Sequence, residues 1–296
     1  MQHTDLSPIP SGPFSRIIVA VDASPASDRA ARLAISLARA DGRVELVFLH
    51  AIDVHRMLVQ ADRCFDDFGL ALAAARDAAR GLLDRCCALA RAAGVFARSY
   101  VREGKPASEI VWLAGALGAD LVVIGNSSGG KLRRILCGSI RDDIVRASSL
   151  PVLVADLDRP RTVEFSPRCI VAPLEDAPAS QRAVRLAADI AKAYAARLVL
   201  VSAAADGRPP AALLNEVRHG LGPLDVTRLV STQPWSGAIE RAVVEHQPDL
   251  VVMGVTPQPA LRGLVCTTIA ERLLHEDRMP LLVVRGEPPA HRLKGL

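Results

Sequence analysis

Aromatic residues are scarce in this sequence: Phe, Trp and Tyr make up only 3% of its 296 residues. Proteins that bind single-stranded nucleic acid stack bases on aromatic side chains, and proteins that bind duplexes gather Lys and Arg on one face. Here the basic and acidic residues are interspersed without a long basic block, and the formal net charge is only +4. We therefore do not expect nucleic acid among the partners.

Long apolar runs and a positively charged leader are lacking as well. No apolar stretch reaches the roughly 18–20 residues that a membrane span requires. The N-terminal stretch MQHTDLSPIPSGPF is polar and rich in proline, which predicts an unstructured tail rather than a secretion signal. We expect neither a membrane partner nor export.

Cysteine pairs with the spacing of a metal or redox site are also missing. No C-x-x-C occurs among the six cysteines, and the adjacent Cys86 and Cys87 lie in a helical stretch rich in Ala and Leu. Reduced thiols are the ordinary state of such cysteines in the cytoplasm. The sequence thus predicts a cytoplasmic protein with reduced cysteines, which are Cys64, Cys86, Cys87, Cys137, Cys169 and Cys266.

What the chain does contain is an internal repeat, which indicates two domains of the same kind. LVVIG at 121–125 returns as LVVMG at 250–254, an offset of 129 residues. Near the start of each half, IVAVDASPAS at 18–27 matches IVAPLEDAPAS at 170–180, an offset of 152 with one extra residue in the second copy. A length of 296 residues suits two domains of about 150 residues. We predict a first domain over 14–156, a linker over 157–166 and a second domain over 167–286.

Each half alternates short apolar runs with longer amphipathic ones, which is typical of a parallel sheet covered by helices. The near-continuous apolarity of the short runs indicates strands that are buried on both faces. Ser24 and Pro25 supply an N-cap and a first helical residue, and further helices are predicted at 70–93 and 107–117. Right-handed crossovers then give a doubly wound α/β sandwich in each half. The predicted strands cover 16–21, 44–51, 95–101, 120–125 and 151–155, then 168–172, 197–203, 225–231, 249–254 and 280–284.

A near-match to a phosphate loop follows the fourth strand of the first half. Residues 125–132, GNSSGGKL, are one letter short of the Walker pattern G-x-x-x-x-G-K-[ST]. A Walker loop holds Mg²⁺ through its final Ser or Thr, and Leu132 cannot do so. The better helix start is Ser139, which follows Gly138 and precedes two aspartates. We therefore reject the Walker interpretation and predict a longer anion cradle that runs from Gly125 to Ser139.

The spacing of that cradle resembles the universal stress protein family. Gly125, two residues, Ser128, nine residues and then Gly138-Ser139 correspond to the G-x2-G-x9-G-[ST] of its ATP-binding members. The resemblance covers nearly the whole chain, as two tandem copies. It implies two doubly wound, parallel five-stranded sheets of the Rossmann-like, adenine nucleotide alpha hydrolase-like type. Their fifth strands would pair antiparallel in an intramolecular pseudo-dimer. Further segments that resemble the family are VDASPAS at 21–27, LHAID at 49–53 and GADLVVIG at 118–125.

The resemblance also implies a ligand in the first half, ATP or a related adenine nucleotide, with or without Mg²⁺. Asp22 would contact the adenosine, the Ala51 backbone would read the adenine edge, and residues after the fourth strand would surround the ribose and phosphates. The family's second glycine is Ser128 here, so a Cβ stands where the backbone approaches the ligand. The implied cofactor-binding residues are Ala20, Val21, Asp22, Ala51, Gly125, Asn126, Ser127, Ser128, Gly138, Ser139 and Ile140.

The second half departs further from the family pattern, and we expect no ATP there. Pro257 replaces the second glycine and lacks an N–H donor. Thr267 replaces the third glycine and crowds the phosphate entry. Leu174 stands where Asp22 would be, unless one of the two acidic residues that follow takes its place.

Several candidate residues have plainer interpretations. Asp22 could cap a turn or a helix, and three loop cations could be solvated charges rather than phosphate ligands. The histidines and the cysteine near the second strand lack the tight spacing of a metal site, so no metal ligand is predicted. Ser139 has no adjacent base, so no catalytic residue is predicted. The loop cations are Lys131, Arg133 and Arg134, and the rejected metal candidates are His50, His55 and Cys64.

Two functions of different classes follow from these patterns. The first is adenine-nucleotide sensing or storage in the cytoplasm, coupled to the stress response through a conformational change or an unidentified downstream protein. The second is a nucleotide-free scaffold whose pockets are vestigial. An ATPase ranks last, because no Mg²⁺-holding residue and no general base is found in the near-Walker stretch. Any ATP hydrolysis would be slow and incidental, and a homodimer of the tandem chain is left open.

Overall fold

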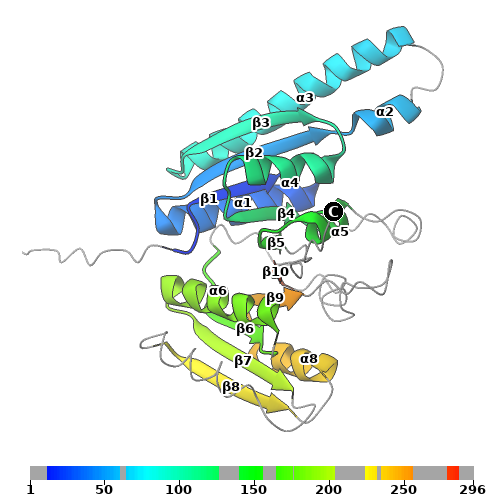
Figure 1. Cartoon of the computed structure of the whole chain (residues 1–296). Helices are drawn as coiled ribbons and strands as arrows, with labels where there is room; N and C mark the ends of the chain where they lie inside the picture. The colour runs from blue at the N-terminus through cyan, green and yellow to red at the C-terminus, as the bar shows by residue number, and fades with distance from the viewer. Residues whose placement is uncertain are drawn as a thin grey trace, which may run out of the picture.

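A computed structural model shows one ten-stranded sheet that is covered by helices on both faces (Figure 1). It describes residues 12–60, 65–126, 140–155, 165–175, 177–203, 224–231, 235–255 and 279–286. The first half contains β1 (Arg16–Ala20), α1 (Pro25–Asp41), β2 (Glu45–Ile52), α2 (Val54–Gln60), α3 (Phe65–Ala92), β3 (Ala97–Glu103), α4 (Pro106–Ala116), β4 (Leu121–Gly125), α5 (Ile140–Ala147) and β5 (Val152–Ala155). The second contains β6 (Cys169–Pro173), α6 (Pro178–Tyr194), β7 (Arg197–Ala203), β8 (Val226–Ser231), α8 (Trp235–His246), β9 (Leu250–Val255) and β10 (Leu281–Arg285).

The strand order is β3-β2-β1-β4-β5-β10-β9-β6-β7-β8, so each half contributes five consecutive strands. Neighbouring strands within a half are parallel, whereas β5 and β10 are antiparallel, with Leu282 opposite Leu153. The predicted α/β class is confirmed, and so is the antiparallel pairing of the fifth strands. Because those two strands pair, the two predicted sheets form one continuous sheet and neither leaves its fifth strand as an open edge.

Two apolar layers lie on opposite faces of this sheet. One packs α1, α3 and α6 against side chains such as Ile17, Val19 and Ile170. The other packs α4, α5 and α8 against alternate residues of the same strands, such as Ile18 and Val171. Both layers run through the two halves and consist almost wholly of Ala, Val, Leu and Ile, as the scarcity of aromatics predicts. None of the helices in the described ranges has the length and apolarity that crossing a membrane would require.

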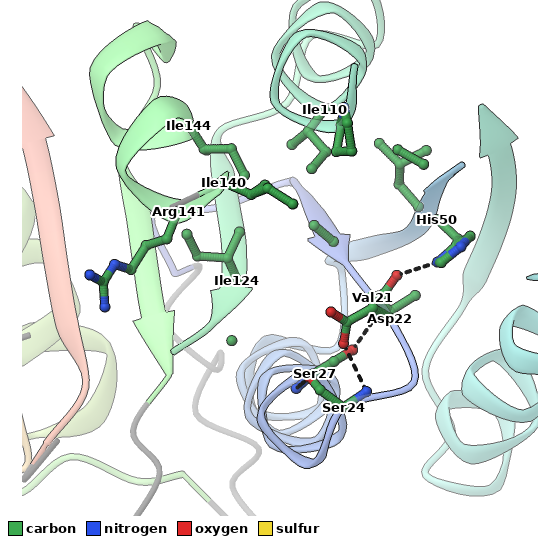
Figure 2. A pocket seen from close by; sticks show the side chains of 15 residues that line it. Val21, Asp22, Ser24, Ser27, His50, Ile110, Ile124, Ile140, Arg141 and Ile144 are labelled. Atoms are coloured by element: carbon green, nitrogen blue, oxygen red, sulfur yellow. Dashed lines mark hydrogen bonds between the residues drawn. The ribbon is translucent and has the colours of Figure 1, made fainter. Parts of the chain in front are cut away.

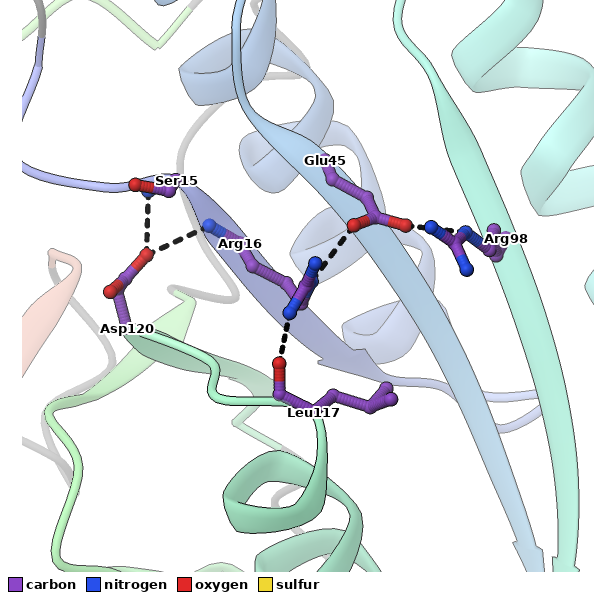
Figure 3. A network of polar contacts seen from close by, with 6 residues as sticks. All are labelled: Ser15, Arg16, Glu45, Arg98, Leu117 and Asp120. Atoms are coloured by element: carbon purple, nitrogen blue, oxygen red, sulfur yellow. Dashed lines mark hydrogen bonds and ion pairs between the residues drawn. The ribbon is translucent and has the colours of Figure 1, made fainter.

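A carboxylate fixes the start of the first strand in each half. Asp120 Oδ2 accepts hydrogen bonds from the backbone N–H groups of Ser15 and Arg16, at 2.6 and 2.8 Å. The Arg16 side chain donates to Leu117 O and pairs with Glu45, which also pairs with Arg98 (Figure 3). In the second half, Asp249 Oδ2 accepts from the N–H groups of Arg168 and Cys169, at 2.8 and 3.1 Å. The repeat therefore extends to individual hydrogen bonds.

These equivalences correct the predicted alignment of the two first strands. Ile17 pairs with Leu121, and Ile170 pairs with Leu250, which lies 129 residues after Leu121. Ile170 is therefore the counterpart of Ile17, and the offset is 170 − 17, or 153 residues. The two segments align without the extra residue expected in the second copy. Runs of similar aliphatic residues match almost as well after a one-residue shift, which is why the sequence alone gave the wrong alignment.

The first turn of α1 is built as predicted. Ser24 is the N-cap, with its Oγ accepting from Ser27 N at 3.2 Å, and Pro25 is the first helical residue. The helix ends at Gly42, whose φ of 69° is left-handed. In α6 the N-cap is Ala177, which offers no side-chain oxygen. The first half therefore has a capping hydroxyl at this turn that the second half lacks.

Candidate functional site

A cavity lies at the carboxyl ends of β1 and β4 in the first half, between α1, α4 and α5 (Figure 2). Strand order reverses there, because β2 and β3 follow β1 on one side and β4 and β5 lie on the other. In open α/β sheets, ligands bind in the crevice at such a switch point. Its apolar wall is made by Ile110 of α4, Ile124 of β4, and Ile140 and Ile144 of α5. Ile140 keeps 50% of its surface exposed, so it gives the cavity an apolar rim.

Asp22 lies on the polar side of the cavity. Its Oδ1 accepts from Ser24 N at 2.9 Å, and its own N–H donates to Ser27 Oγ at 2.8 Å. Asp22 thus caps a turn, which was the plainer interpretation. Within the ranges that the structure describes, however, Oδ2 has no hydrogen-bond partner, and the residue is exposed to the cavity. One oxygen holds the loop while the other can accept from a ligand.

His50 and Ala51 form the adjoining wall at the end of β2. His50 Nδ1 lies 2.7 Å from Val21 O, so the protonated Nδ1 donates to that carbonyl. This bond fixes the ring beside the cavity (Figure 2). In the described part of the chain, no group of three or more His, Cys, Asp or Glu residues is placed to hold a metal ion. Cys64 lies outside the described residues.

Gly125 borders the cavity at the end of β4, yet its missing side chain has a structural cause. A Cβ there would lie 2.5 Å from Ala26 C and 2.8 Å from Ser27 N, inside the first turn of α1. Gly254 meets the corresponding turn of α6, where a Cβ would lie 2.4 Å from Ala179 C and from the next backbone nitrogen. The glycine was attributed to close approach of a ligand. Its presence in both halves shows that helix–strand packing is sufficient to require it.

Asn126 and Arg141 form a polar pair that adjoins the cavity. Arg141 Nη1 donates to Asn126 Oδ1, and its Nε donates to Asp142 Oδ1 at 3.1 Å. Arg141 was not among the predicted ligands, although it lines the cavity and its side chain is only 10% exposed. The sequence did contain a sign that Arg141 could bind a ligand: it is a basic residue in the first turn of a helix, where its charge opposes the helix dipole.

The structure brings six of the eleven predicted ligand residues together around the cavity. Asn126 is buried next to them rather than in the wall. Four more, together with the loop cations and Leu132, lie outside the described residues, so their predicted roles stay predictions. The six in the wall are Ala20, Val21, Asp22, Ala51, Gly125 and Ile140, and the four are Ser127, Ser128, Gly138 and Ser139.

In the second half, Glu175 occupies the position of Asp22. Its N–H donates to Ser180 Oγ at 2.8 Å, as that of Asp22 donates to Ser27 Oγ. The carboxylate is one methylene longer and, although the residue is partly exposed, burial of the group raises its pKa above the ordinary value. An acidic group is therefore present at this position in both halves.

The prediction that Leu174 replaces Asp22 is wrong, and the alternative, that one of the two following acidic residues takes its place, is confirmed for Glu175. Leu174 is buried, and its N–H donates to Val201 O at 2.7 Å, just as Val21 N donates to Leu49 O at 2.8 Å. Leu174 is thus the counterpart of Val21, and the error follows directly from the misplaced extra residue. Pro257 and Thr267, on which the prediction of no ATP also rests, lie outside the described residues.

Comparison with known sequences gives a consistent result. A family model described as the Universal stress protein family matches residues 13–156 and 208–285. A universal stress protein of Methanocaldococcus jannaschii is 29% identical over 142 residues, which are 48% of this chain and 81% of the relative. A universal stress protein of Mycobacterium tuberculosis is 27% identical over 187 residues, which are 56% of this chain and 62% of the relative.

Solved structures agree on the fold. The crystal structure of a universal stress protein from Archaeoglobus fulgidus superposes with a TM-score of 0.74 at 18% identity, covering 92% of this chain and 98% of that one. A putative universal stress protein from Pseudomonas aeruginosa gives a TM-score of 0.55 at 17% identity, covering 92% and 94%. At these identities the likeness shows the fold alone. It extends over both halves of the chain.

Proposed function

The chain belongs to the universal stress protein family, and from this premise we propose that it acts in the stress response by binding ATP or a related adenine nucleotide in its first half. The observation that supports this most is the cavity at the β1–β4 switch point. It combines an apolar wall with an open carboxylate oxygen and the backbone of three strand ends. This combination suits a nucleoside, whose flat base carries an exocyclic N–H and whose ribose carries hydroxyl groups.

Each part of the cavity has a role in this proposal. The adenine ring would lie against the isoleucines, where burying its faces is favourable. Asp22 Oδ2 would accept from an N–H or O–H of the adenosine, and the Ala51 backbone would read the ring edge. Ala20, Val21 and Gly125 would supply the strand-end backbone around the ribose. Asn126, Ser127, Ser128, Gly138, Ser139 and Ile140 would surround the ribose and phosphates, with or without Mg²⁺.

The second half is proposed to be a packing partner without ATP. Val255 stands at the end of β9 where Asn126 stands at the end of β4, so a hydrogen-bonding side chain is replaced by an apolar one. We propose the domain limits 14–156 and 167–286, with 157–166 as the linker. A cytoplasmic location, coupling to a downstream protein and any association of two chains belong to the same proposal.

Titration calorimetry with ATP, AMP and adenosine tests the proposal, using Asp22→Asn as the diagnostic variant. An asparagine can still accept from Ser24 N, so the turn is kept, but its amide presents a donor where Oδ2 was an acceptor. Losing a charged hydrogen bond of this kind costs about 1.5–3 kcal/mol, or roughly 10- to 150-fold in affinity. Asp28→Asn is the control, because Asp28 pairs with Arg32 on α1 and does not line the cavity.

The outcomes separate the two functions considered. Binding near one nucleotide per chain that Asp22→Asn weakens and Asp28→Asn preserves would support the nucleotide-binding proposal. Absence of binding by the unaltered protein to all three ligands would refute it. A nucleotide-free scaffold would then be the better proposal for the function.

A further inference from the structure

We propose that Arg141, held in place by Asn126, recognises a phosphate of the ligand and makes the site prefer phosphorylated nucleosides over unphosphorylated ones. The inference rests on the proposed function, since it concerns the same cavity. It assigns a specificity-determining role to a side chain, whereas the glycine-rich cradle would contribute backbone groups.

The surroundings of Arg141 are those of a prepared anion site. Its side chain is only 10% exposed, and Asn126, to which it donates through Nη1, is 2% exposed. A guanidinium has five N–H donors. In the described part of the chain Arg141 uses two of them, one to Asn126 and one to Asp142. Three donors of a fixed, planar group therefore remain for a ligand, and a phosphate oxygen pair is the acceptor that fits such a fork.

The position of Arg141 is costly for the protein without a ligand. A cation in the first turn of a helix faces the positive end of the dipole, and α5 begins at Ile140. Nine-tenths burial of its side chain adds desolvation, which one carboxylate on the next residue offsets only in part. A bound phosphate would lie at the favourable end of the dipole and would neutralise the guanidinium. The ligand would thus relieve both costs.

The two halves of the chain supply an internal comparison. At the repeat offset of 129, Val255 replaces Asn126 and Ala270 replaces Arg141. Val255 is buried at the end of β9 as Asn126 is at the end of β4. Both members of the pair are therefore apolar in the second half, where the same sheet, helix α6 and glycine contact are nevertheless formed. The polar pair is therefore not required for the sheet, α6 or the glycine contact to form.

Figure 2 shows how Arg141 relates to the rest of the cavity. Its side chain runs past Ile124, and its guanidinium is turned away from Asp22 and His50. The cavity therefore has a carboxylate at one end, an apolar wall in the middle and a cation beyond the other end. A nucleotide has the matching sequence of groups: a base and ribose with N–H and O–H donors, then a phosphate.

The test compares AMP with adenosine by titration calorimetry. Arg141→Ala should weaken AMP binding about 10- to 100-fold, as expected for losing charge-assisted hydrogen bonds, and should change adenosine binding less than about twofold. Arg146→Ala is the matched control: it removes the same charge from the same helix at an exposed position outside the cavity. Asn126→Val, which copies the second half, should give an intermediate loss for AMP because Arg141 loses its anchor.

Each result has a distinct meaning. Equal losses for AMP and adenosine in Arg141→Ala, or no loss for either, would overturn the inference while nucleotide binding itself stands. An unaltered protein that binds inorganic pyrophosphate through Arg141, but no adenosine or AMP, would uphold the anion site and refute the adenine proposal. A protein that binds none of these probes would refute both. Thermal unfolding of each variant shows whether a lost affinity reflects a lost fold.

Discussion

Adding one methyl group at Gly125 should destabilise the protein, because the space for it is occupied by the backbone of α1. The Cβ of an alanine would lie 2.5, 2.6 and 2.8 Å from Ala26 C, Ala26 O and Ser27 N, distances that real Cβ atoms essentially never show. These atoms belong to a capped helical turn and cannot rotate away as a side chain would. Overpacking costs about 1–3 kcal/mol, of which the stiffer unfolded chain returns roughly 0.5–1. Because all three contacts are with backbone atoms, we expect the upper end of this range, which leaves a net loss of about 2 kcal/mol.

Thermal unfolding followed by circular dichroism measures this loss. At about 2–4 °C per kcal/mol for chains of 150–250 residues, the midpoint should fall by roughly 4–8 °C. Gly254→Ala should behave alike, since its Cβ would lie 2.4 Å from Ala179 C and Ser180 N. Only Gly125→Ala should also weaken nucleotide binding, because it displaces the turn that orients Asp22.

A glycine-to-alanine substitution inside α4 should change the stability in the opposite direction, and it serves as the control. Gly115 lies inside α4, and no atom outside its own helical turn lies within 4 Å of the place that an alanine methyl would take. Gly115→Ala should therefore stabilise the protein by about 0.5–1 kcal/mol. Midpoints for Gly125→Ala and Gly254→Ala at or above that of the unaltered protein would refute the packing argument. The glycine at the end of β4 would then need another explanation.

Three further predictions concern a backbone-binding carboxylate, a buried thiol and the acidic residue of the second half. Asp120→Ala removes the acceptor of two backbone N–H groups, so the free energy of unfolding, measured in urea, should fall by about 1–3 kcal/mol. A fall below about 0.5 kcal/mol, the lower limit for one hydrogen bond, would contradict this. Burial raises the pKa of Cys86 from 9.0 to about 11, so with the other cysteines replaced its alkylation at pH 8 should be about a hundredfold slower than in denaturant. The raised pKa of Glu175 means that the folded state binds its proton more tightly, so stability is lost as pH rises above the unfolded value near 4.5. Glu175→Gln should therefore raise the melting midpoint more at pH 7 than at pH 4.

Most of the fold could be predicted from the sequence because parallel strands buried on both faces leave unmistakable apolar runs. The predicted strand at 197–203 coincides with β7, and the others differ from the observed limits by one or two residues. The register between the halves could not be predicted as well, because aliphatic residues are interchangeable in such strands. The hydrogen bonds of Asp120 and Asp249 establish this register, and they join residues that are far apart in sequence.

The candidate site was predictable where it follows a strand end and less so where it depends on packing. Asp22 and Ala51 come directly after or within strands whose ends meet at the switch point, so position alone indicated them. Arg141 was missed because its neighbours, such as Asn126, are brought to it by the fold and not by adjacent sequence. The packing requirement at Gly125 could not be predicted, since the turn of α1 that fills its space is distant in the chain.

The antiparallel joint between β5 and β10 has a consequence for how the halves can differ. Two identical subunits must carry every substitution twice, and their association weakens on dilution. Here one polypeptide links the halves, so their stoichiometry is fixed at one to one and does not depend on concentration. Each half is then free to change alone. Two equivalent positions illustrate this: Val255 in the second half corresponds to Asn126 in the first, and Ser202 corresponds to His50. Such a chain can keep one half for its ligand while the other is reshaped for a different task.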